Sequence, residues 1–372
     1  MLYVTKPSLP PLEEYVKEIS TLWDSRILTN MGVKHYELET ALCEFLKVKN
    51  MKLFANGHLA LEAALQIFDF PQGAEVITTP FTFISTTNAI LRSGLIPVFC
   101  DVKDDDGTID PMLIEPLITS KTAAILPVHV YGNLCDVDAI YKIAEQYKLK
   151  VIYDAAHAFG VTRKPDNAGA GSFGDISMFS FHATKVFHTF EGGGLAFNDS
   201  SLSVKLQAWR NFGYLEGDVI LPGGNAKMCE AHAAIGLCNL RHLEENISAR
   251  KRNFELYCNL LSGYPGLSII TPHPHIKPNY SYFPIRINAG DFGLTRDGLF
   301  DILEEKEIHT RKYFELTSSY KSILGKNKPP ANTPVAERFS EEVLILPLYP
   351  ELEETSIAEI CDIIKHAGKS II

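Results

Sequence analysis

The chain has 372 residues, a length typical of one large domain accompanied by a smaller one. It is 46% hydrophobic and 22% charged, as globular enzymes commonly are. The net charge of −10 at pH 7 argues against a nucleic-acid-binding protein, because that function usually needs a basic surface, but it does not exclude a ligand that carries a diphosphate.

The seven cysteines are scattered among apolar neighbours, and none forms a CxxC pair. An odd number without metal-ligand spacing is typical of reduced thiols, so we expect a cytoplasmic protein without a metal site. We expect no signal peptide, because the sequence does not open with a basic segment and an apolar run. We expect no membrane-spanning helix either, because no run reaches about 18 apolar residues.

The first part of the chain predicts two helices and then a phosphate-binding turn. Apolar residues recur at helical spacing over 12–24, a second helix is expected over 35–48, and the loop 27–32 between them contains Asn30. Residues 52–66 predict a short strand, a turn and an alanine-rich helix that begins at Gly57 and His58. Free backbone amides and the helix dipole make such a helix start a site for a phosphate group.

Strands and helices then alternate as far as Asp154. Strands are predicted within 75–88, 95–101, 123–132 and 151–154, with helices following the first of them and over 111–119 and 136–147. This alternation predicts an α/β fold in which helices cover both faces of a mostly parallel sheet. Ligand sites of such sheets lie beyond the carboxyl ends of the strands, where Asp154 and the Gly57 turn both fall.

Lys185 lies in the most informative stretch of the sequence, residues 176–199. An apolar, strand-like segment over 176–181 precedes it, and Glu191, three glycines and a second strand-like segment over 195–197 follow it. A lysine between two buried strands favours Schiff-base chemistry, since partial desolvation lowers the pKa of an amine and exposes its lone pair. Ser180, five residues earlier, could bind a phosphate with its hydroxyl. The alternative is an ordinary solvated lysine in a loop.

The rest of the chain predicts a helix over 200–210, a loop over 213–228 that contains Asn225, and a long helix over about 228–262. Residues 268–372 predict a smaller α/β unit, with strands over 268–271, 280–287 and 343–346 and helices over 295–306, 335–341 and 354–366. We therefore expect a large domain over residues 1–250 and a small C-terminal domain over residues 251–372.

Three segments, Asp154-Ala-Ala-His157, Ser180-Phe-His-Ala-Thr-Lys185 and Glu191-Gly-Gly, resemble the DegT family of sugar-nucleotide aminotransferases, which use pyridoxal 5'-phosphate (PLP). The resemblance covers nearly the whole chain and implies the fold-type I PLP-dependent transferase fold. It implies that Lys185 binds the aldehyde of PLP. It also implies that Asp154, 31 residues earlier, keeps the ring nitrogen protonated, so that the ring can accept electrons.

Further cofactor contacts follow from the same resemblance. His157 would lie near the 3-hydroxyl of the ring and Phe83 would stack on the ring, although ordinary core or capping positions are the alternatives. The family usually has Ser-Gly-Thr where this chain has Asn56-Gly57-His58, so the backbone amides would still bind the phosphate without the threonine hydroxyl. His58 either replaces that hydroxyl or only caps the helix.

Asn225 matches a family asparagine that reaches across a dimer interface to the phosphate of the neighbouring cofactor. The resemblance therefore implies a homodimer whose active sites are shared, in which Ser180 binds the same phosphate. The alternative is a turn residue after two glycines.

The resemblance also implies three substrate contacts. Asn30 lies in a segment that forms the mouth of the active site in this family, and Arg311 and Tyr313 lie in a segment that approaches the substrate. The alternatives are a helix-capping turn for Asn30 and a surface ion pair for Arg311.

The implied activity is transfer of the amino group of L-glutamate to a keto-sugar attached to a nucleotide diphosphate, with Lys185 as the base and acid. The Lys185 segment followed by Glu191-Gly-Gly favours members that aminate carbon 4 of a 4-keto-6-deoxy sugar. We expect dTDP-4-keto-6-deoxyglucose as the acceptor and O-antigen, lipopolysaccharide or another surface polysaccharide as the destination. Nucleic-acid and membrane partners are not expected.

Three alternatives stay open, namely a carbon-3 aminotransferase of the same family, another PLP-dependent chemistry and a non-catalytic regulatory member. The presence of Lys185 and Asp154 favours an enzyme over a regulator. Lys185 also argues against the dehydratases of the family, which have a histidine at that position.

Overall fold

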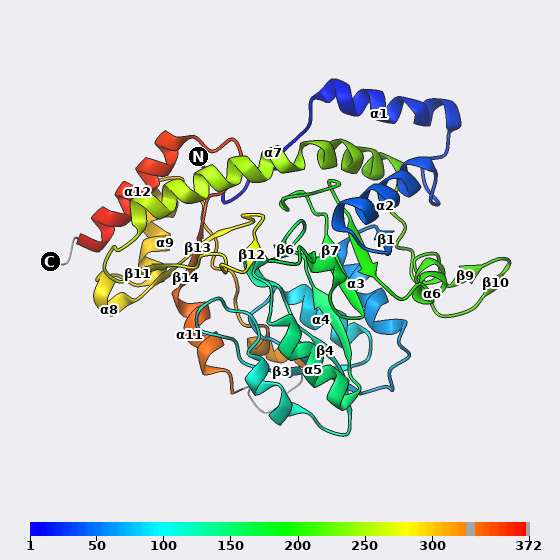
Figure 1. The fold of residues 1–372 in the computed structure, drawn as a ribbon. Coiled ribbons are helices and arrows are strands. Elements are labelled where there is room, and N and C mark those ends of the chain that lie inside the picture. The colour runs from blue at the N-terminus through cyan, green and yellow to red at the C-terminus, as the bar shows by residue number, and fades with distance from the viewer. Residues whose placement is uncertain (325–331, 370–372) are drawn as a thin grey trace.

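The computed structural model describes residues 1–324 and 332–369 (Figure 1). The α-helices are α1 (Leu12–Ser25), α2 (Val33–Leu46), α3 (Gly57–Gln66), α4 (Ile84–Arg92), α5 (Val137–Tyr147), α6 (Leu202–Trp209), α7 (Glu230–Leu261), α8 (Ala289–Phe292), α9 (Arg296–Glu305), α10 (Lys321–Leu324), α11 (Pro334–Glu342) and α12 (Glu354–Lys369). The strands are β1 (Asn50–Phe54), β2 (Glu75–Thr78), β3 (Ile96–Phe99), β4 (Thr122–Leu126), β5 (Lys150–Asp154), β6 (Thr162–Arg163), β7 (Ile176–Ser180), β8 (Gly193–Phe197), β9 (Tyr214–Leu215), β10 (Asp218–Val219), β11 (Leu267–Ile269), β12 (Ile276–Lys277), β13 (Phe283–Ile287) and β14 (Val343–Leu346).

The centre of the fold is a seven-stranded sheet in the order β1-β8-β7-β5-β4-β2-β3 (Figure 1). The pairs β2–β3, β2–β4, β4–β5 and β5–β7 are parallel, whereas β8 is antiparallel to both of its neighbours, β7 and β1. The prediction of a mostly parallel sheet is therefore confirmed. Asp154 ends β5 and Ser180 ends the adjacent strand β7, so the two residues lie at the same edge of the sheet.

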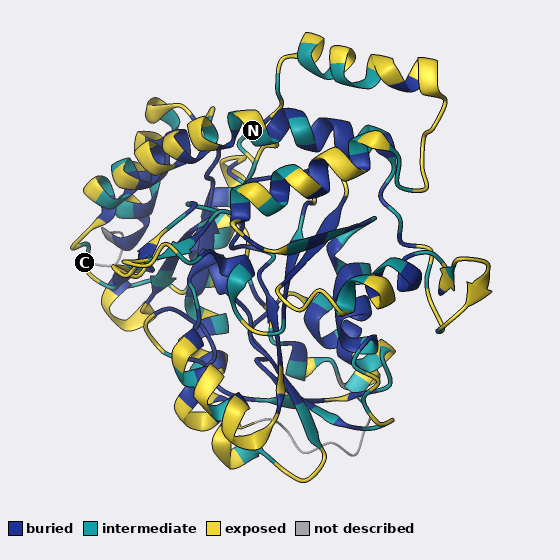
Figure 2. Ribbon diagram, turned by 45° about the vertical axis from the view of Figure 1, so that its right-hand side comes forward, coloured by how far each residue is buried: buried dark blue, intermediate teal, exposed yellow. Residues whose placement is uncertain are grey.

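Buried apolar side chains cover both faces of this sheet. Met178 of β7 packs in a cluster with α3, α4 and α6, whereas its neighbour Phe179 packs in a cluster with α2 and α7. Successive side chains of a strand point to opposite faces, which places one cluster on each side. Figure 2 shows mostly buried strands at the centre, with helices around them whose exposed residues lie toward the outside. Packing on both sides fixes the strand ends on which the site depends.

The prediction of a helix over residues 111–119 is wrong. This segment forms two short 3₁₀ turns, Pro111–Leu113 and Glu115–Leu117. Pro116 lies in its middle, where it has no backbone N–H to donate and its ring excludes the preceding turn of a regular α-helix. The other predicted helices and strands agree with the observed ones to within a few residues at their ends.

The C-terminal part contains a three-stranded antiparallel sheet in the order β11-β13-β14, which shares one apolar cluster with α9 and α12. Helix α7 has 32 residues and packs against both α2 and α12, so it spans the large and the C-terminal parts (Figure 1). The boundary predicted at residue 250 falls within α7, and the division into two domains stays a prediction. Within the described ranges, no helix offers the long apolar stretch that crossing a membrane requires.

Candidate active site

The turn between β1 and α3 is a candidate anion site. Asn56 is the N-cap of α3, and its side-chain oxygen accepts a hydrogen bond from the amide of Leu59 at 2.9 Å. The amides of Gly57 and His58 have no acceptor among the described residues. A Cβ added to Gly57 would lie 3.1 Å from the Cβ of Ser180, so this helix start directly adjoins the end of β7. Two free amides therefore lie beside Ser180, at a helix start that suits a phosphate group.

Gly193 explains why glycines follow the Lys185 segment. It begins β8, and a Cβ at this position would lie 2.5 Å from the backbone nitrogen of Gly57. Any larger residue would push the start of α3 away from the sheet. The glycine-rich segment therefore allows the close backbone contact that shapes the anion site.

The imidazole of His58 lies between α3 and α4. Its Nδ1 is 2.8 Å from the hydroxyl of Ser85, and its Nε2 is 2.9 Å from a carboxylate oxygen of Glu62. Because Asn56 already caps α3, the capping role considered for His58 is not observed. The side chain of His58 is thus engaged by Ser85 of α4 and by Glu62 of its own helix, and its backbone amide stays available to an anion.

Asp154 is buried at the end of β5, with 5% of its surface exposed. Burial raises the pKa of its carboxyl above the usual value, and this effect is opposed by hydrogen bonds and by the charge of Lys185. The hydroxyl of Thr86 donates to one oxygen at 2.8 Å, and the amide of Ala156 donates to the other at 3.1 Å. A buried carboxylate held in this way favours a positively charged nitrogen on a bound ligand.

Lys185 follows β7 and is half-buried. Its Nζ lies 3.3 Å from the hydroxyl of Tyr282 and 5.9 Å from the centroid of that ring. Its charge acts on both Asp154 and His157. The amine therefore faces a cluster of polar and aromatic side chains, which does not fit the alternative of a fully solvated loop lysine.

His157 is buried beside Lys185 and is held in one tautomer. Its Nδ1 accepts a hydrogen bond from the backbone amide of Tyr131 at 3.2 Å, so the ring proton is on Nε2. Burial, and to a smaller degree the charge of Lys185, lowers its pKa well below the usual value. The ring stacks on Phe314 at 5.6 Å and lies edge-on to Tyr282 at 4.9 Å. A neutral histidine in this position can donate a hydrogen bond from Nε2.

Phe83 is the N-cap residue of α4, and 56% of its surface is exposed. Its alternative as an ordinary core residue is therefore not observed. It precedes Thr86 by three residues, which places an exposed ring on the same helix start that holds Asp154. Such a ring is available to cover a flat ligand.

Asn30 lies in an exposed loop and has a left-handed backbone conformation, with φ of 64°. It does not cap α2, whose N-cap is Gly32. The loop is held by Glu230, whose carboxylate accepts from the amides of Gly32 at 2.9 Å and Lys34 at 2.8 Å. Asn30 is thus presented to solvent from an anchored loop.

Arg311 and Tyr313 differ in their surroundings. Arg311 is exposed and forms no ion pair within the described part of the chain, so the surface ion pair considered for it is not observed. Tyr313 is half-buried, with its ring 6.3 Å from that of Tyr282. Its carbonyl accepts a hydrogen bond from the hydroxyl of Tyr131. Tyr313 therefore belongs to the aromatic cluster around Lys185.

Asn225 is exposed, and its side-chain oxygen accepts a hydrogen bond from Lys227 at 2.9 Å. The described residues of its own chain include no hydrogen bond between Asn225 and another predicted cofactor residue. The next residue, Ala226, accepts a hydrogen bond from the amide of Ala55 at 2.7 Å, so Asn225 lies on a segment that adjoins the β1–α3 turn of its own chain.

The sequence did not single out Tyr282, Thr86 or Tyr131. Thr86 belongs to a run of three hydroxyl residues at a helix start, which is a usable signal. Tyr282 precedes β13 and reaches Lys185 only through the packing of the C-terminal part on the sheet, for which no local pattern exists.

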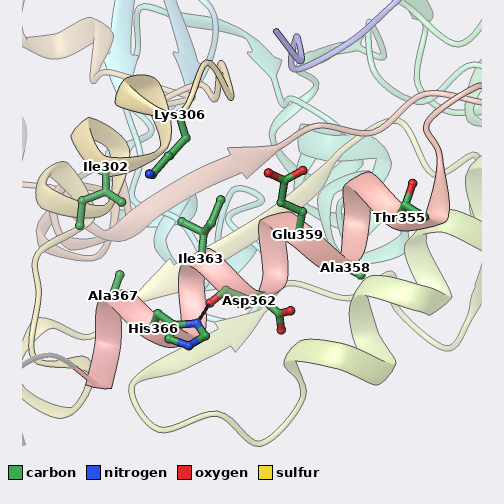
Figure 3. A pocket seen from close by; sticks show the side chains of 9 residues that line it. All are labelled: Ile302, Lys306, Thr355, Ala358, Glu359, Asp362, Ile363, His366 and Ala367. Carbon is green, nitrogen blue, oxygen red and sulfur yellow. Dashed lines mark hydrogen bonds between the residues drawn. The ribbon is translucent and has the colours of Figure 1, made fainter.

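A separate groove of about 680 Å³ lies between α9 and α12 (Figure 3). The ring of His366, which lines it, forms a hydrogen bond with the carbonyl of Asp362 on the same helix at 2.6 Å. None of the predicted site residues lines it. We assign it no part in the active site.

The cluster around Lys185 matches the chemical groups of PLP. The amides of Gly57 and His58 suit its phosphate, Asp154 suits its ring nitrogen, and the amine of Lys185 suits its aldehyde. The exposed ring of Phe83 suits its flat face. The residues present thus fit this cofactor.

Comparison with known proteins agrees with this chemistry. The sequence profile of the DegT/DnrJ/EryC1/StrS aminotransferase family matches residues 12–365. The dTDP-4-amino-4,6-dideoxy-D-glucose transaminase of Shigella dysenteriae is 41% identical over 366 residues, which are 98% of each chain. The Escherichia coli protein of the same name is 43% identical over 365 residues, which are 96% of each chain.

The fold is also similar to the crystal structure of DesI in the presence of its TDP-sugar product. The TM-score is 0.94 at 31% sequence identity, and the match covers 99% of this chain and 93% of DesI. The chain therefore belongs to the DegT/DnrJ/EryC1/StrS aminotransferase family and is a PLP-dependent aminotransferase.

Proposed function

We propose that the protein transfers the amino group of L-glutamate to carbon 4 of dTDP-4-keto-6-deoxyglucose, giving dTDP-4-amino-4,6-dideoxyglucose. The observation that carries this proposal is the half-buried Lys185 amine acting on the buried carboxylate of Asp154. The names and full-length similarity of the two bacterial relatives support the choice of acceptor.

Lys185 moves the proton in this scheme. When bound, PLP supplies an electron sink and carries the amino group between the two substrates. The Nζ of Lys185 takes a proton from the α carbon of the donor and returns one on the way to product. The hydroxyl of Tyr282 accepts a hydrogen bond from this amine at 3.3 Å and orients it.

The other residues bind and orient. The carboxylate of Asp154 would hold a protonated ring nitrogen. The hydroxyl of Thr86 donates to this carboxylate and fixes its orientation. The amides of Gly57 and His58 and the hydroxyl of Ser180 bind the phosphate. His157 donates from Nε2 to the ring hydroxyl, and Phe83 covers the ring.

Substrate binding is assigned to Asn30, Arg311 and Tyr313. The exposed guanidinium of Arg311, without a carboxylate partner in the described part of the chain, suits a diphosphate. Tyr313 lies close enough to the Lys185 cluster to contact the sugar. Asn30 lies on the anchored loop that precedes α2.

We propose that the working form is a homodimer in which Asn225 binds the cofactor phosphate of the partner subunit. Several large apolar side chains are exposed on α1, including Leu12 at 69% and Trp23 at 72%. The hairpin of β9 and β10 adds exposed Tyr214 and Val219 and extends from the body of the molecule (Figure 1). Exposure of this kind is typical of a surface covered in an assembly.

The proposal also includes cytoplasmic location, a role in O-antigen or other surface polysaccharide synthesis, and domains over residues 1–250 and 251–372.

The test is a product assay with matched acceptors. Purified protein with PLP and L-glutamate is given dTDP-4-keto-6-deoxyglucose or the corresponding 3-keto sugar, and the products are identified by mass spectrometry and NMR. The proposal predicts an amine at carbon 4 and release of 2-oxoglutarate. Amination of the 3-keto sugar alone would contradict the choice of acceptor but not the aminotransferase activity.

A further inference from the structure

The first turn of α4 connects three parts of the site. It contains three consecutive hydroxyl residues, Ser85, Thr86 and Thr87, and each hydroxyl forms a hydrogen bond with a different part of the chain. Ser85 meets the ring of His58 on α3, and Thr86 donates to Asp154 on β5. Thr87 donates to Thr317, four residues after Tyr313, at 2.8 Å. One helix turn thus contacts the anion site, the buried carboxylate and the C-terminal segment.

His58 is the link on the side of the anion site. Its Nε2 faces the carboxylate of Glu62, which accepts hydrogen bonds and therefore fixes a proton on Nε2. Nδ1 is then free to accept from the Ser85 hydroxyl at 2.8 Å. Glu62 is buried and is also bonded by Arg92 at the end of α4, so α3 and α4 are connected on both sides of the ring.

We propose that His58 is a positioning residue that couples the phosphate-binding start of α3 to α4 and, through Thr86, to Asp154. The inference rests on the proposed cofactor site. In this chain the bond between His58 and Ser85 sets the distance between the phosphate end and the ring-nitrogen end of the cofactor site. His58 does so without a side-chain contact to the phosphate.

The two ring nitrogens of His58 can be tested separately. In His58→Asn, the side-chain amide lies where Nδ1 lies, so the contact with Ser85 is kept and the contact with Glu62 is lost. In His58→Gln, the amide lies where Nε2 lies, so the contact with Glu62 is kept and the contact with Ser85 is lost. Ser85→Ala removes the same contact from the other side.

The same two helices provide a matched control. The side chain of Gln66, at the end of α3, donates to the hydroxyl of Ser93, which caps α4, at 3.5 Å. Ser93→Ala removes a hydroxyl contact between α3 and α4 at the ends far from the anion site. A general loss of packing between the helices would affect this variant and Ser85→Ala alike.

The measurements are the dissociation constant of PLP and the visible spectrum of the bound cofactor. We expect His58→Gln and Ser85→Ala to weaken PLP binding about three- to tenfold, the effect of one hydrogen bond, and to shift the visible band. Ser93→Ala should stay within about twofold of the unchanged protein, and His58→Asn should lose less PLP affinity than His58→Gln. The double variant His58→Gln, Ser85→Ala should be no weaker than either single variant.

Three outcomes would overturn the inference. His58→Asn could bind PLP as weakly as His58→Gln, Ser93→Ala could match Ser85→Ala, or the effects of His58→Gln and Ser85→Ala could add. Thermal unfolding of the apoproteins shows whether each variant folds, and Ser85→Ala tests the link if a His58 variant does not fold. If the unchanged protein does not bind PLP, the proposed function fails, which is a different result from failure of the coupling.

Discussion

The amine of Lys185 lies 3.3 Å from the hydroxyl of Tyr282, 97 positions further along the chain. Lys185 follows a strand of the large sheet, whereas Tyr282 immediately precedes β13 of the C-terminal sheet. The proposed catalytic lysine therefore contacts a part of the chain that lies outside the main sheet. If Lys185 acts as proposed, the position of the C-terminal sheet affects catalysis.

Tyr282→Phe should lower kcat about three- to tenfold and leave PLP affinity unchanged, because it removes one hydrogen bond to the Lys185 amine and keeps the ring. Steady-state kinetics with saturating PLP, together with a PLP titration, check this. A loss of PLP affinity with an unchanged kcat would show that Tyr282 acts on cofactor binding instead of on the lysine.

Asp154→Asn should abolish most activity and stabilise the apoprotein. Activity should fall by about two orders of magnitude or more, because the charge that holds the protonated ring nitrogen is lost. Burial raises the pKa of Asp154 in the folded state above that in the unfolded state, so ionisation costs stability once the pH rises through the folded pKa. That cost is absent below the unfolded pKa, where both states are protonated.

The stability difference between the Asp154→Asn apoprotein and the unchanged apoprotein therefore depends on pH. It should favour the variant at neutral pH and shrink as the pH falls below the usual range of aspartate. Thermal unfolding of both apoproteins across this range measures the difference. The predicted sign would be contradicted if the stability advantage of the variant over the unchanged protein were smaller at neutral pH than at acidic pH.

Mixing two inactive variants tests the shared active site. Lys185→Ala keeps Asn225, and Asn225→Ala keeps Lys185, so a mixed dimer contains one site with both residues intact if Asn225 acts on the partner's cofactor. Random exchange of equal amounts should restore about a quarter of the sites, measured as activity at limiting PLP. If both residues act within one chain, exchange restores nothing, and separately refolded mixtures provide the baseline.

The sequence predicted the alternating α/β pattern well because strand and helix periodicities are local properties. The prediction of a helix over 111–119 was wrong because of a local detail, the proline at position 116. The prediction had followed the apolar residues and gave that proline too little weight. Gly57, Ser180 and Asp154 could be placed at strand and helix ends, and the structure brings Gly57 against Ser180. Their roles, like those of the other site residues, stay predictions.

Long-range contacts are the part that the sequence could not provide. Nothing near Tyr282 indicates that its hydroxyl reaches Lys185, because that contact depends on how two sheets are arranged. His58 was left between two roles, and its ring takes a third, between Ser85 and Glu62. The contact of Tyr282 depends on a side chain that is distant in the sequence, and the contact of His58 with Ser85 depends on a neighbouring helix.

The most direct test of the central claim is the absorption spectrum of the purified protein with PLP, before and after L-glutamate, beside Lys185→Ala. We predict a visible band for the unchanged protein that moves to the near ultraviolet when L-glutamate is added and 2-oxoglutarate appears. Lys185→Ala should bind PLP only non-covalently and show no such conversion. No visible band with PLP, or conversion by Lys185→Ala at the rate of the unchanged protein, would contradict the assignment of Lys185.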